Sequence, residues 1–375
     1  MGAVAGARHA GATLTIDLGA IRANYRLLRG RLGGTACAAV VKADAYGLGA
    51  AVVAPALAAE GCRQFFVAHL DEALALRPLL PEAEVFVLNG LPAGAEVDCA
   101  AHRVTPVLNS LAQVDAWAAH SRRLDRALPA ALQVDSGMSR LGLSDAEIDA
   151  LAEDPRRLEG IGLRLVMSHL VCAERQDHLM NREQLRRFKA VRARLPKAPA
   201  SLANSSGVFL GPDFHFDLAR PGAALYGLAP VAGEANPMRP VVRLRGRIVQ
   251  TRVIAAGTAV GYGASWQAAG PRRIATIAVG YADGYLRSLG NCATAFAGGT
   301  AVPLVGIVSM DTATFDVTDA PQAVEGGFLE LIGPRNPIDA LAGQAATIGY
   351  EILTSLGGRY ARAYADAPQN ERVTA

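Results

Sequence analysis

Lysine is scarce in this sequence. Of its 37 lysine and arginine residues only three are lysines, namely Lys42, Lys189 and Lys197. A reaction that needs an amine nucleophile therefore has three candidates in this chain. Lys189 lies in a stretch with the apolar spacing of an amphipathic helix, and Lys197 lies close to two prolines, so both are more simply surface lysines. Lys42 is the remaining candidate nucleophile.

Cysteine and net charge are also low. The five cysteines are scattered and never form a C-x-x-C pair, which argues against a disulfide framework and a metal site and favours a reducing cytoplasm. The formal net charge is only +3 over 375 residues, so no nucleic-acid partner is expected. The arginines of residues 182–194 alternate with Leu185, Phe188 and Val191, which predicts the solvated face of an amphipathic helix.

Long apolar runs are missing as well. No run approaches the ~20 residues that a membrane-spanning helix needs. The start of the chain, Met1 to Gly11, lacks the apolar core and cleavage pattern of an export signal. With 51% hydrophobic and 19% charged residues, the chain is apolar enough to bury a large core. These features predict a globular, cytoplasmic protein without a membrane association.

Short apolar strands alternate with helical stretches from Thr13 to about residue 220. Asp17 has the position of a helix N-cap after a first strand at Thr13–Ile16. Eight further strands are expected, at residues 36–41, 65–68, 85–88, 104–108, 131–134, 163–168, 201–203 and 216–219. Eight buried strands with helices between them predict a (β/α)8 TIM-type barrel, with a doubly wound sheet as the alternative.

Polar residues just past the strand ends favour the barrel, because the active site of such barrels lies at that end. These residues are Lys42, His69, Asn89, Asn109, Asp135, His169, Asn204 and Arg220. Beyond about residue 235, β-rich runs separated by glycine and proline predict a second, mainly β domain. We expect a barrel domain at residues 1–235 and a β domain at residues 236–375. The first strand, at about 12–16, is counted with the barrel although it can pack with the β domain.

The most informative segment surrounds Lys42. A buried strand delivers this lysine to its exit, and a turn containing Gly47 and Gly49 follows. A partly buried lysine loses its charge more easily, which a nucleophilic amine requires. The two glycines are not a dinucleotide fingerprint, since the third glycine and the distant acidic residue are missing.

The run from Val40 to Gly49 resembles the pyridoxal-phosphate lysine motif of the alanine racemase family. Other segments resemble the family in the same order, namely Val134–Gly142, Met167–Leu170, Asn204–Ser205, Arg220–Gly222, Gly261–Ala264, Gly280–Gly284, Ser309–Asp311 and Gly349–Glu351. The resemblance implies pyridoxal 5'-phosphate as cofactor and interconversion of L- and D-alanine. It also implies a homodimer with shared active sites, in which the barrel of one subunit meets Tyr262 and Met310 of the other.

Racemisation needs a base on each face of the substrate Cα, and the resemblance assigns Lys42 to the D face and Tyr262 to the L face. A tyrosine with the ordinary pKa of ~10 is a weak base at neutral pH, so Tyr262 needs nearby positive charge or strong donors. The resemblance implies that His169 and Arg220 provide them. The resemblance also implies cofactor contacts from Tyr46, Asn204, Ser205, Gly222, Ala223 and Tyr350, substrate contacts from Arg140 and Met310, and supporting roles for Gln133, Tyr281 and Asp311.

Arg220 separates the racemase from a barrel-type decarboxylase. The resemblance places its guanidinium against the pyridine nitrogen of the cofactor, and a cation with a pKa above ~12 does not give that nitrogen a proton. The ring is then a poorer electron sink, which suppresses transamination. A non-catalytic carrier of the cofactor is disfavoured because it leaves the β domain unexplained.

Two points of the resemblance leave alternatives open. Many family members have a carbamylated lysine where this chain has Gln133, so we expect activity that does not depend on bicarbonate. The substrate is the second point. Small pockets discriminate weakly against one added hydroxyl, so serine or a broader set of amino acids is the alternative to alanine.

Overall fold

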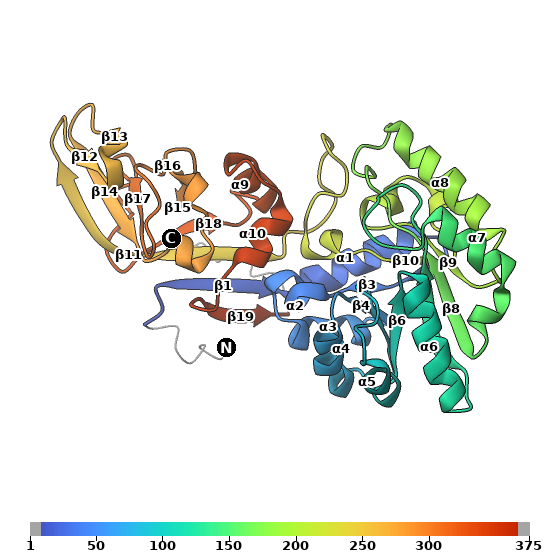
Figure 1. Ribbon diagram of the computed structural model, residues 1–375. Helices are drawn as coiled ribbons and strands as arrows, with labels where there is room; N and C mark the ends of the chain where they lie inside the picture. The colour runs from blue at the N-terminus through green and yellow to red at the C-terminus, as the bar shows by residue number, and fades with distance from the viewer. Residues whose placement is uncertain (1–8, 367–375) are drawn as a thin grey trace. The chain divides into compact units, whose positions relative to one another are not determined.

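The computed structural model describes residues 9–366. Most of the segment from Met1 to Gly11, for which no export signal is predicted, lies outside these residues. The chain divides into two compact units (Figure 1). The first contains the residues up to Ile21, Tyr226–Leu228 and the residues from Arg239 onward. The second contains Arg22–Leu225 and Ala229–Met238. The first is called the β unit and the second the barrel unit.

The second unit is built on a parallel sheet in the order β3-β4-β5-β6-β7-β8-β9. Its strands are β3 (Ala39–Val40), β4 (Gln64–Val67), β5 (Glu84–Val87), β6 (Val104–Leu108), β7 (Leu128–Gln133), β8 (Ile161–Met167) and β9 (Ala200–Ser201). The pairing of β7 with β8 shifts its register between Ala130 and Ala131. Phe66 is paired with Phe86 across β4 and β5, and their stacked rings lie 4.5 Å apart in the core.

The eighth strand closes this sheet into a barrel. β10 (Leu218–Ala219) pairs in parallel with β2 (Ala36–Cys37), which precedes β3 on the same stretch of chain. On the other side, the Arg220 N–H donates to the Ala203 carbonyl at 2.9 Å, which links β10 to the chain after β9. The predicted (β/α)8 barrel is therefore confirmed. The predicted strand at 216–219 is shorter than expected, because Phe216 has a φ of 51° and cannot continue an extended strand.

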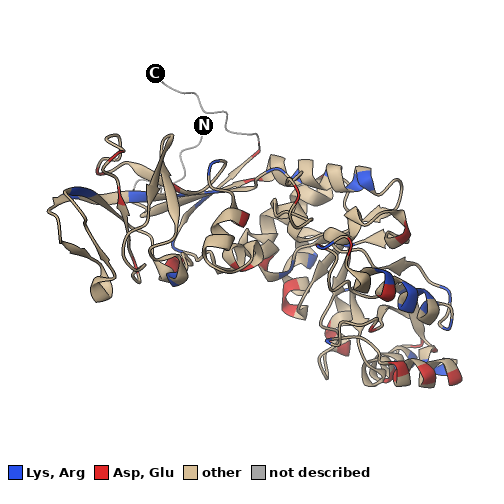
Figure 2. Cartoon of the chain, turned by 90° about the horizontal axis from the view of Figure 1, so that it is seen from above, with Lys and Arg blue, Asp and Glu red and all other residues tan. Residues whose placement is uncertain are grey.

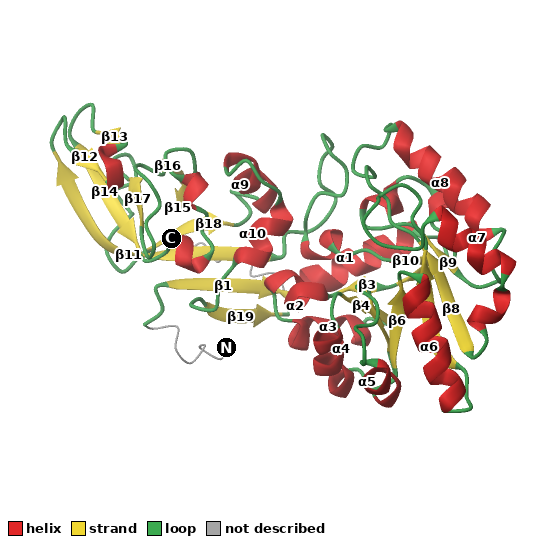
Figure 3. Cartoon of the chain, viewed as in Figure 1, coloured by secondary structure: helices red, strands yellow, loops and turns green. Residues whose placement is uncertain are grey.

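Helices cover the outside of the barrel (Figure 3). They are α1 (Leu18–Arg31), α3 (Ala50–Ala59), α4 (Leu70–Leu76), α5 (Glu96–Ala101), α6 (Leu111–Arg123), α7 (Asp145–Glu153) and α8 (Leu179–Arg192). The short segment α2 (Lys42–Gly47) follows β3 and has left-handed backbone angles. Asp17 caps α1 as predicted, accepting the Ala20 N–H at 2.8 Å. α8 buries Phe188 and Val191 and exposes its arginines, and basic and acidic residues are mixed along these helices (Figure 2).

The short 3-10 helices of the barrel unit are η1 (Arg77–Leu79), η2 (Pro155–Leu158), η3 (Ser206–Phe209) and η4 (Pro212–Phe214), with η5 (Ala223–Tyr226) at its end. Those of the β unit are η6 (Tyr262–Ala264), η7 (Tyr281–Asp283) and η8 (Arg287–Leu289). Across residues 9–366, no helix is long and apolar enough to span a membrane.

The β unit is organised around β11 (Val242–Ile254), which pairs with β1 (Ala12–Asp17), β14 (Arg272–Ile277) and β18 (Phe328–Ile332). β1 also pairs in parallel with β19 (Ala361–Ala365), so the first strand lies in this unit and not in the barrel. The other elements are β12 (Ala259–Val260), β13 (Trp266–Gln267), β15 (Thr294–Ala297), β16 (Thr300–Pro303), β17 (Ala313–Asp316), α9 (Ile338–Gln344) and α10 (Gly349–Ser355). The predicted mainly β fold of this part is confirmed.

Candidate active site

The mouth of the barrel gathers the polar residues that follow its strands. The carboxyl ends of parallel strands meet at one end of the barrel, which is where such barrels carry their active sites. Lys42, Arg140 and His169 come from three different strand exits here. Arg140 lowers the pKa of Lys42, and both cations lower the pKa of His169. They are therefore electrostatic neighbours in a partly buried, positively charged site.

Lys42 is partly buried at the exit of β3. Burial lowers the pKa of its amine, and the positive charge of Arg140 lowers it further, whereas Glu72 opposes the shift. A lowered pKa raises the fraction of neutral amine near pH 7, and the neutral amine is the nucleophile. The site therefore favours the reactive form of this lysine.

Arg220 is held in place at the end of β10. Its Nη2 donates to the Ser168 carbonyl at 2.6 Å, and its Nη1 donates to the Ser201 hydroxyl. The guanidinium carbon also lies 5.9 Å from the centroid of the Phe66 ring, within cation-π distance. Burial lowers the pKa of Arg220 to about 9, so the side chain is still a cation at neutral pH.

The charge of His169 is set by its burial and its neighbours. Burial, followed by the positive charges of Arg220, Arg140 and Lys42, lowers the pKa of His169 to about 3. The imidazole is therefore neutral at neutral pH. It can take part in hydrogen bonds with a neighbouring group, but the positive charge of the site comes from the arginines.

The chain after Lys42 takes an unusual path. Ala43, Asp44, Ala45 and Tyr46 all have left-handed backbone angles, with φ between 51° and 56°. Left-handed backbone costs L-residues roughly 1–2 kcal/mol each. The Asp44 carboxylate accepts the Ala50 N–H at 2.7 Å at the far side of the turn. Strained backbone of this kind persists where the surrounding contacts impose it, which is typical of functional sites.

A cluster of polar groups follows β9 and β10. The Ser205 hydroxyl oxygen accepts the N–H groups of Gly222 and Ala224 at 2.9 and 3.1 Å, so its own hydrogen remains available to donate. Within residues 9–366, the Ala223 N–H between them has no hydrogen-bond partner. A Cβ atom at Gly222 would lie 2.4 Å from the Tyr46 hydroxyl, so only glycine allows this approach. These donors, at the usual phosphate position of such barrels, suit an anion.

Asn204 belongs to the same part of the barrel mouth. Its Oδ1 accepts the Gly207 N–H at 2.9 Å, at the start of η3. The side chain thus fixes the turn that carries Ser205. Across the described chain, no group of three or more histidine, cysteine or acidic side chains could hold a metal ion.

The loop that carries Arg140 is shaped by the Asp135 carboxylate. Asp135 Oδ1 accepts the N–H groups of Gly137 and Met138 at 2.8 and 2.9 Å. Arg140 itself is exposed at the end of this turn, where a guanidinium fork suits a carboxylate ligand. Gln133 ends β7 and is buried, and its backbone carbonyl accepts the Leu143 N–H at 2.9 Å.

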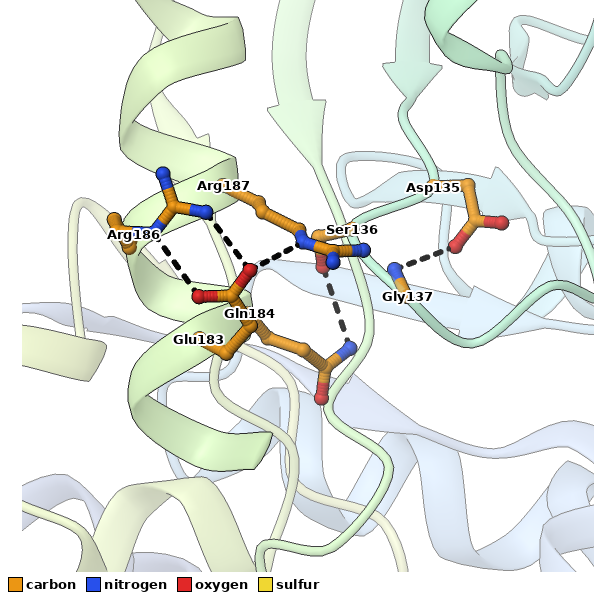
Figure 4. Close-up of polar contacts among 7 residues, drawn as sticks. All are labelled: Asp135, Ser136, Gly137, Glu183, Gln184, Arg186 and Arg187. Carbon is orange, nitrogen blue, oxygen red and sulfur yellow. Dashed lines mark hydrogen bonds and ion pairs between the residues drawn. The ribbon is translucent and has the colours of Figure 1, made fainter. Parts of the chain in front are cut away.

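Gln184 of α8 connects this loop to the neighbouring strand exit (Figure 4). Its fully buried amide donates to the Ser136 hydroxyl at 3.3 Å and to the His169 carbonyl at 2.8 Å. Ser136 is in turn 2.7 Å from the Ser168 hydroxyl. A continuous buried network therefore joins the Arg140 loop, His169 and the backbone that holds Arg220. On the same helix, Glu183 pairs with Arg186 and Arg187 (Figure 4).

Two motifs of the β unit lie side by side. The Tyr281 N–H donates to the Ser309 carbonyl at 3.0 Å, and the Ala282 N–H donates to the Met310 carbonyl at 2.9 Å. A Cβ atom at Gly280 would lie 2.3 Å from both carbonyl oxygens, so a side chain there would separate the motifs.

Arg359 fastens this pair of motifs. Its Nε and Nη2 bind the two oxygens of Asp283 at 2.6 and 2.9 Å, while its Nη1 binds Asp311 at 2.7 Å. These carboxylates raise the pKa of Arg359 above its already high ordinary value. Asp311 is therefore a structural anchor for the chain next to Met310.

Four of the predicted site residues in this unit expose large side chains. Tyr262 is 72% exposed on η6 and Met310 is 54% exposed, while Tyr281 and Tyr350 are exposed to a smaller extent. Tyr262 is flanked by Gly261 and Gly263, both with positive φ, so the backbone presents the ring in a tight turn.

The two units correspond to two recognised protein domains. A family model described as the N-terminal domain of alanine racemase matches residues 16–230, and one for the C-terminal domain matches residues 241–364. The chain belongs to the alanine racemase family.

Several named alanine racemases match almost the whole chain. "Alanine racemase, catabolic" from Mesorhizobium japonicum is 54% identical, over 95% of this chain and 93% of its own. Alanine racemase from Rhodospirillum rubrum is also 54% identical, over 94% and 96%. The crystal structure of alanine racemase from Bartonella henselae with covalently bound pyridoxal phosphate has a TM-score of 0.92 at 44% identity, and covers 95% of this chain and 99% of its own.

The sequence did not predict three residues that contact the segments carrying the site. Glu72 accepts the Ala43 N–H next to Lys42. Gln184 donates to Ser136 in the Arg140 loop, and Arg359 binds Asp311. Only Glu72 had a local signal, since it lies three residues after His69 in a capping-box arrangement. The other two act across distances in sequence that no local pattern indicates.

Proposed function

We propose that this chain is an alanine racemase that interconverts L- and D-alanine with pyridoxal 5'-phosphate. The observation that carries the proposal is Lys42, a partly buried lysine with a lowered pKa at the exit of a barrel strand. The relatives named above, at 54% identity, support alanine as the substrate. The Bartonella henselae protein, which holds pyridoxal phosphate covalently, supports the cofactor.

The groups at the barrel mouth fit this cofactor. Lys42 offers an amine for its aldehyde, and the Ser205 hydroxyl and Ala223 N–H offer donors for its phosphate. The cofactor contacts that we propose are those of Lys42, Tyr46, His169, Asn204, Ser205, Arg220, Gly222, Ala223 and Tyr350. When bound, pyridoxal phosphate draws electrons from the substrate Cα and makes its C–H bond acidic.

The protein side chains then bind the substrate and move its proton. Arg140, with the backbone at Met310 of the partner subunit, holds the substrate carboxylate. Lys42 exchanges the Cα proton on the D face, and Tyr262 of the partner subunit exchanges it on the L face. Arg220 stays a cation beside two oxygen acceptors, and it does not release a proton to a ring nitrogen at neutral pH.

The proposed assembly is a homodimer with shared active sites. The proposal is supported by the family resemblance, which assigns Tyr262 and Met310 to the active site of the other subunit, and by the exposure of both side chains in the β unit. We also place the protein in a reducing cytoplasm, because all five cysteines are free thiols.

The function is tested by following Cα proton-to-deuterium exchange and optical rotation with L-alanine and L-serine. We expect inversion of alanine with simultaneous exchange, and slower inversion of serine. Faster turnover of serine would move the assignment to a racemase of another amino acid. Release of carbon dioxide would instead indicate a decarboxylase, and binding of the cofactor without exchange would indicate a carrier.

A second expected result concerns Gln133. Its neutral amide cannot be carbamylated, so racemisation should proceed at the same rate with and without added bicarbonate. A bound anion next to Arg140 is our proposal for what takes the place of the carbamate. The measurement compares initial rates in degassed and bicarbonate-containing buffer at one pH, with Gln133→Lys as the matched variant. A several-fold activation of the wild-type protein by bicarbonate would contradict this expectation.

A further inference from the structure

Glu72 connects the chain after Lys42 to the neighbouring strand exit. One oxygen of its carboxylate accepts the Ala43 N–H at 2.5 Å. The other accepts the N–H groups of Ala68 and His69 at 2.7 and 3.0 Å, just after β4. Three backbone donors on one carboxylate form a charge-assisted cluster, which is the strong class of hydrogen bond.

The position of this cluster coincides with the start of the left-handed turn. Ala43 is the first of its four left-handed residues, and its N–H is the one that Glu72 binds. Asp44 fixes the opposite end through Ala50. Backbone of this kind needs contacts that impose it, and Glu72 is the side chain that supplies such a contact next to Lys42.

Glu72 also differs in charge from the other groups around the Lys42 amine. Arg140, from the β7 exit, lowers the pKa of Lys42, and Glu72, from α4, raises it. His169, from the β8 exit, is neutral at neutral pH because its own pKa is about 3. Glu72 is therefore the carboxylate that balances the positive potential around the lysine.

We infer that Glu72 is a positioning residue for the catalytic lysine. Its carboxylate fixes the left-handed turn that presents Lys42 at the barrel mouth. Its negative charge also opposes the effect of the Arg140 cation on the Lys42 amine. The inference rests on the proposed function only in calling Lys42 catalytic.

The test uses the full-length chain freed of cofactor and follows the pH dependence of lysine modification by mass spectrometry. The chain has only three lysines, so Lys189 and Lys197 are internal references. In Glu72→Gln the negative charge is lost, and the midpoint of Lys42 modification should move to lower pH. The affinity for pyridoxal phosphate, followed by its visible absorbance, should weaken by ~10-fold, as expected for the loss of a charge-assisted hydrogen bond.

Glu147 provides the matched control. It also closes a capping box, accepting the Ser144 N–H at 2.9 Å, and it reaches the Leu111 N–H at 3.0 Å. Glu147→Gln therefore removes a similar carboxylate contact from the same unit without changing a charge that acts on Lys42. We expect Glu147→Gln to lose about as much thermal stability as Glu72→Gln. Its midpoint of Lys42 modification and its cofactor affinity should equal those of the wild-type protein.

Glu72→Asp separates position from charge, because its shorter carboxylate cannot reach all three donors. We expect weakened cofactor affinity and a midpoint of Lys42 modification closer to the wild-type value. If Glu72→Gln does not fold, Glu72→Asp becomes the test of the inference. Wild-type midpoint and affinity in Glu72→Gln, or wild-type affinity in Glu72→Asp, would overturn the inference. The midpoint is measured without substrate, so it tests Glu72 even if alanine is not the substrate.

Discussion

Lys42→Ala is expected to abolish racemisation, lowering the rate by on the order of 10⁴-fold or more. The change removes both the amine that holds the cofactor and the proposed base for the D face. Neither role passes to another side chain nearby, because the other two lysines lie on α8 and close to Pro196 and Pro199. The visible absorbance of the cofactor after dialysis, together with the rate of inversion of L-alanine, measures the two losses separately.

Lys189→Ala is the matched control, since Lys189 is an exposed residue near the end of α8. It should retain the wild-type rate and the wild-type absorbance. A Lys42→Ala protein that retained more than a tenth of the wild-type rate would show that another group holds the cofactor or moves the proton.

The barrel and the ends of its strands were predictable because they depend on local patterns. Each strand is a short apolar run, and a polar residue at its end needs solvent or a ligand. This logic places Lys42, His169 and Arg220 together at one end of the barrel. The N-cap at Asp17 was predictable for the same reason, because its signal lies within a few residues of the helix.

The left-handed turn after Lys42 was not predictable. Its four residues include two alanines and Tyr46, none of which favours positive φ. The conformation is imposed from outside the segment, by Glu72 from 29 residues away in sequence. A pattern read along the chain cannot show a constraint that comes from another strand exit.

The charge state of His169 also depends on the fold. A histidine has an ordinary pKa near ~6.5, so the sequence alone leaves both forms open at neutral pH. Burial and three neighbouring cations lower the pKa of His169 to about 3. The expectation of positive charge near the L-face tyrosine therefore rests on Arg220, whose two oxygen acceptors keep it in place.

Tyr262→Phe is expected to separate the two faces of the reaction. The variant keeps the ring on its glycine-flanked turn and loses only the hydroxyl, so racemisation should fall by ~10²–10⁴-fold, the range for removal of a general base. Deuterium exchange of L-alanine should fall equally, while D-alanine should still exchange through Lys42 without inversion. Tyr364→Phe in the same unit controls for loss of a partly exposed hydroxyl. Equal loss of exchange from both enantiomers would contradict the two-base assignment, because it would mean that one group serves both faces.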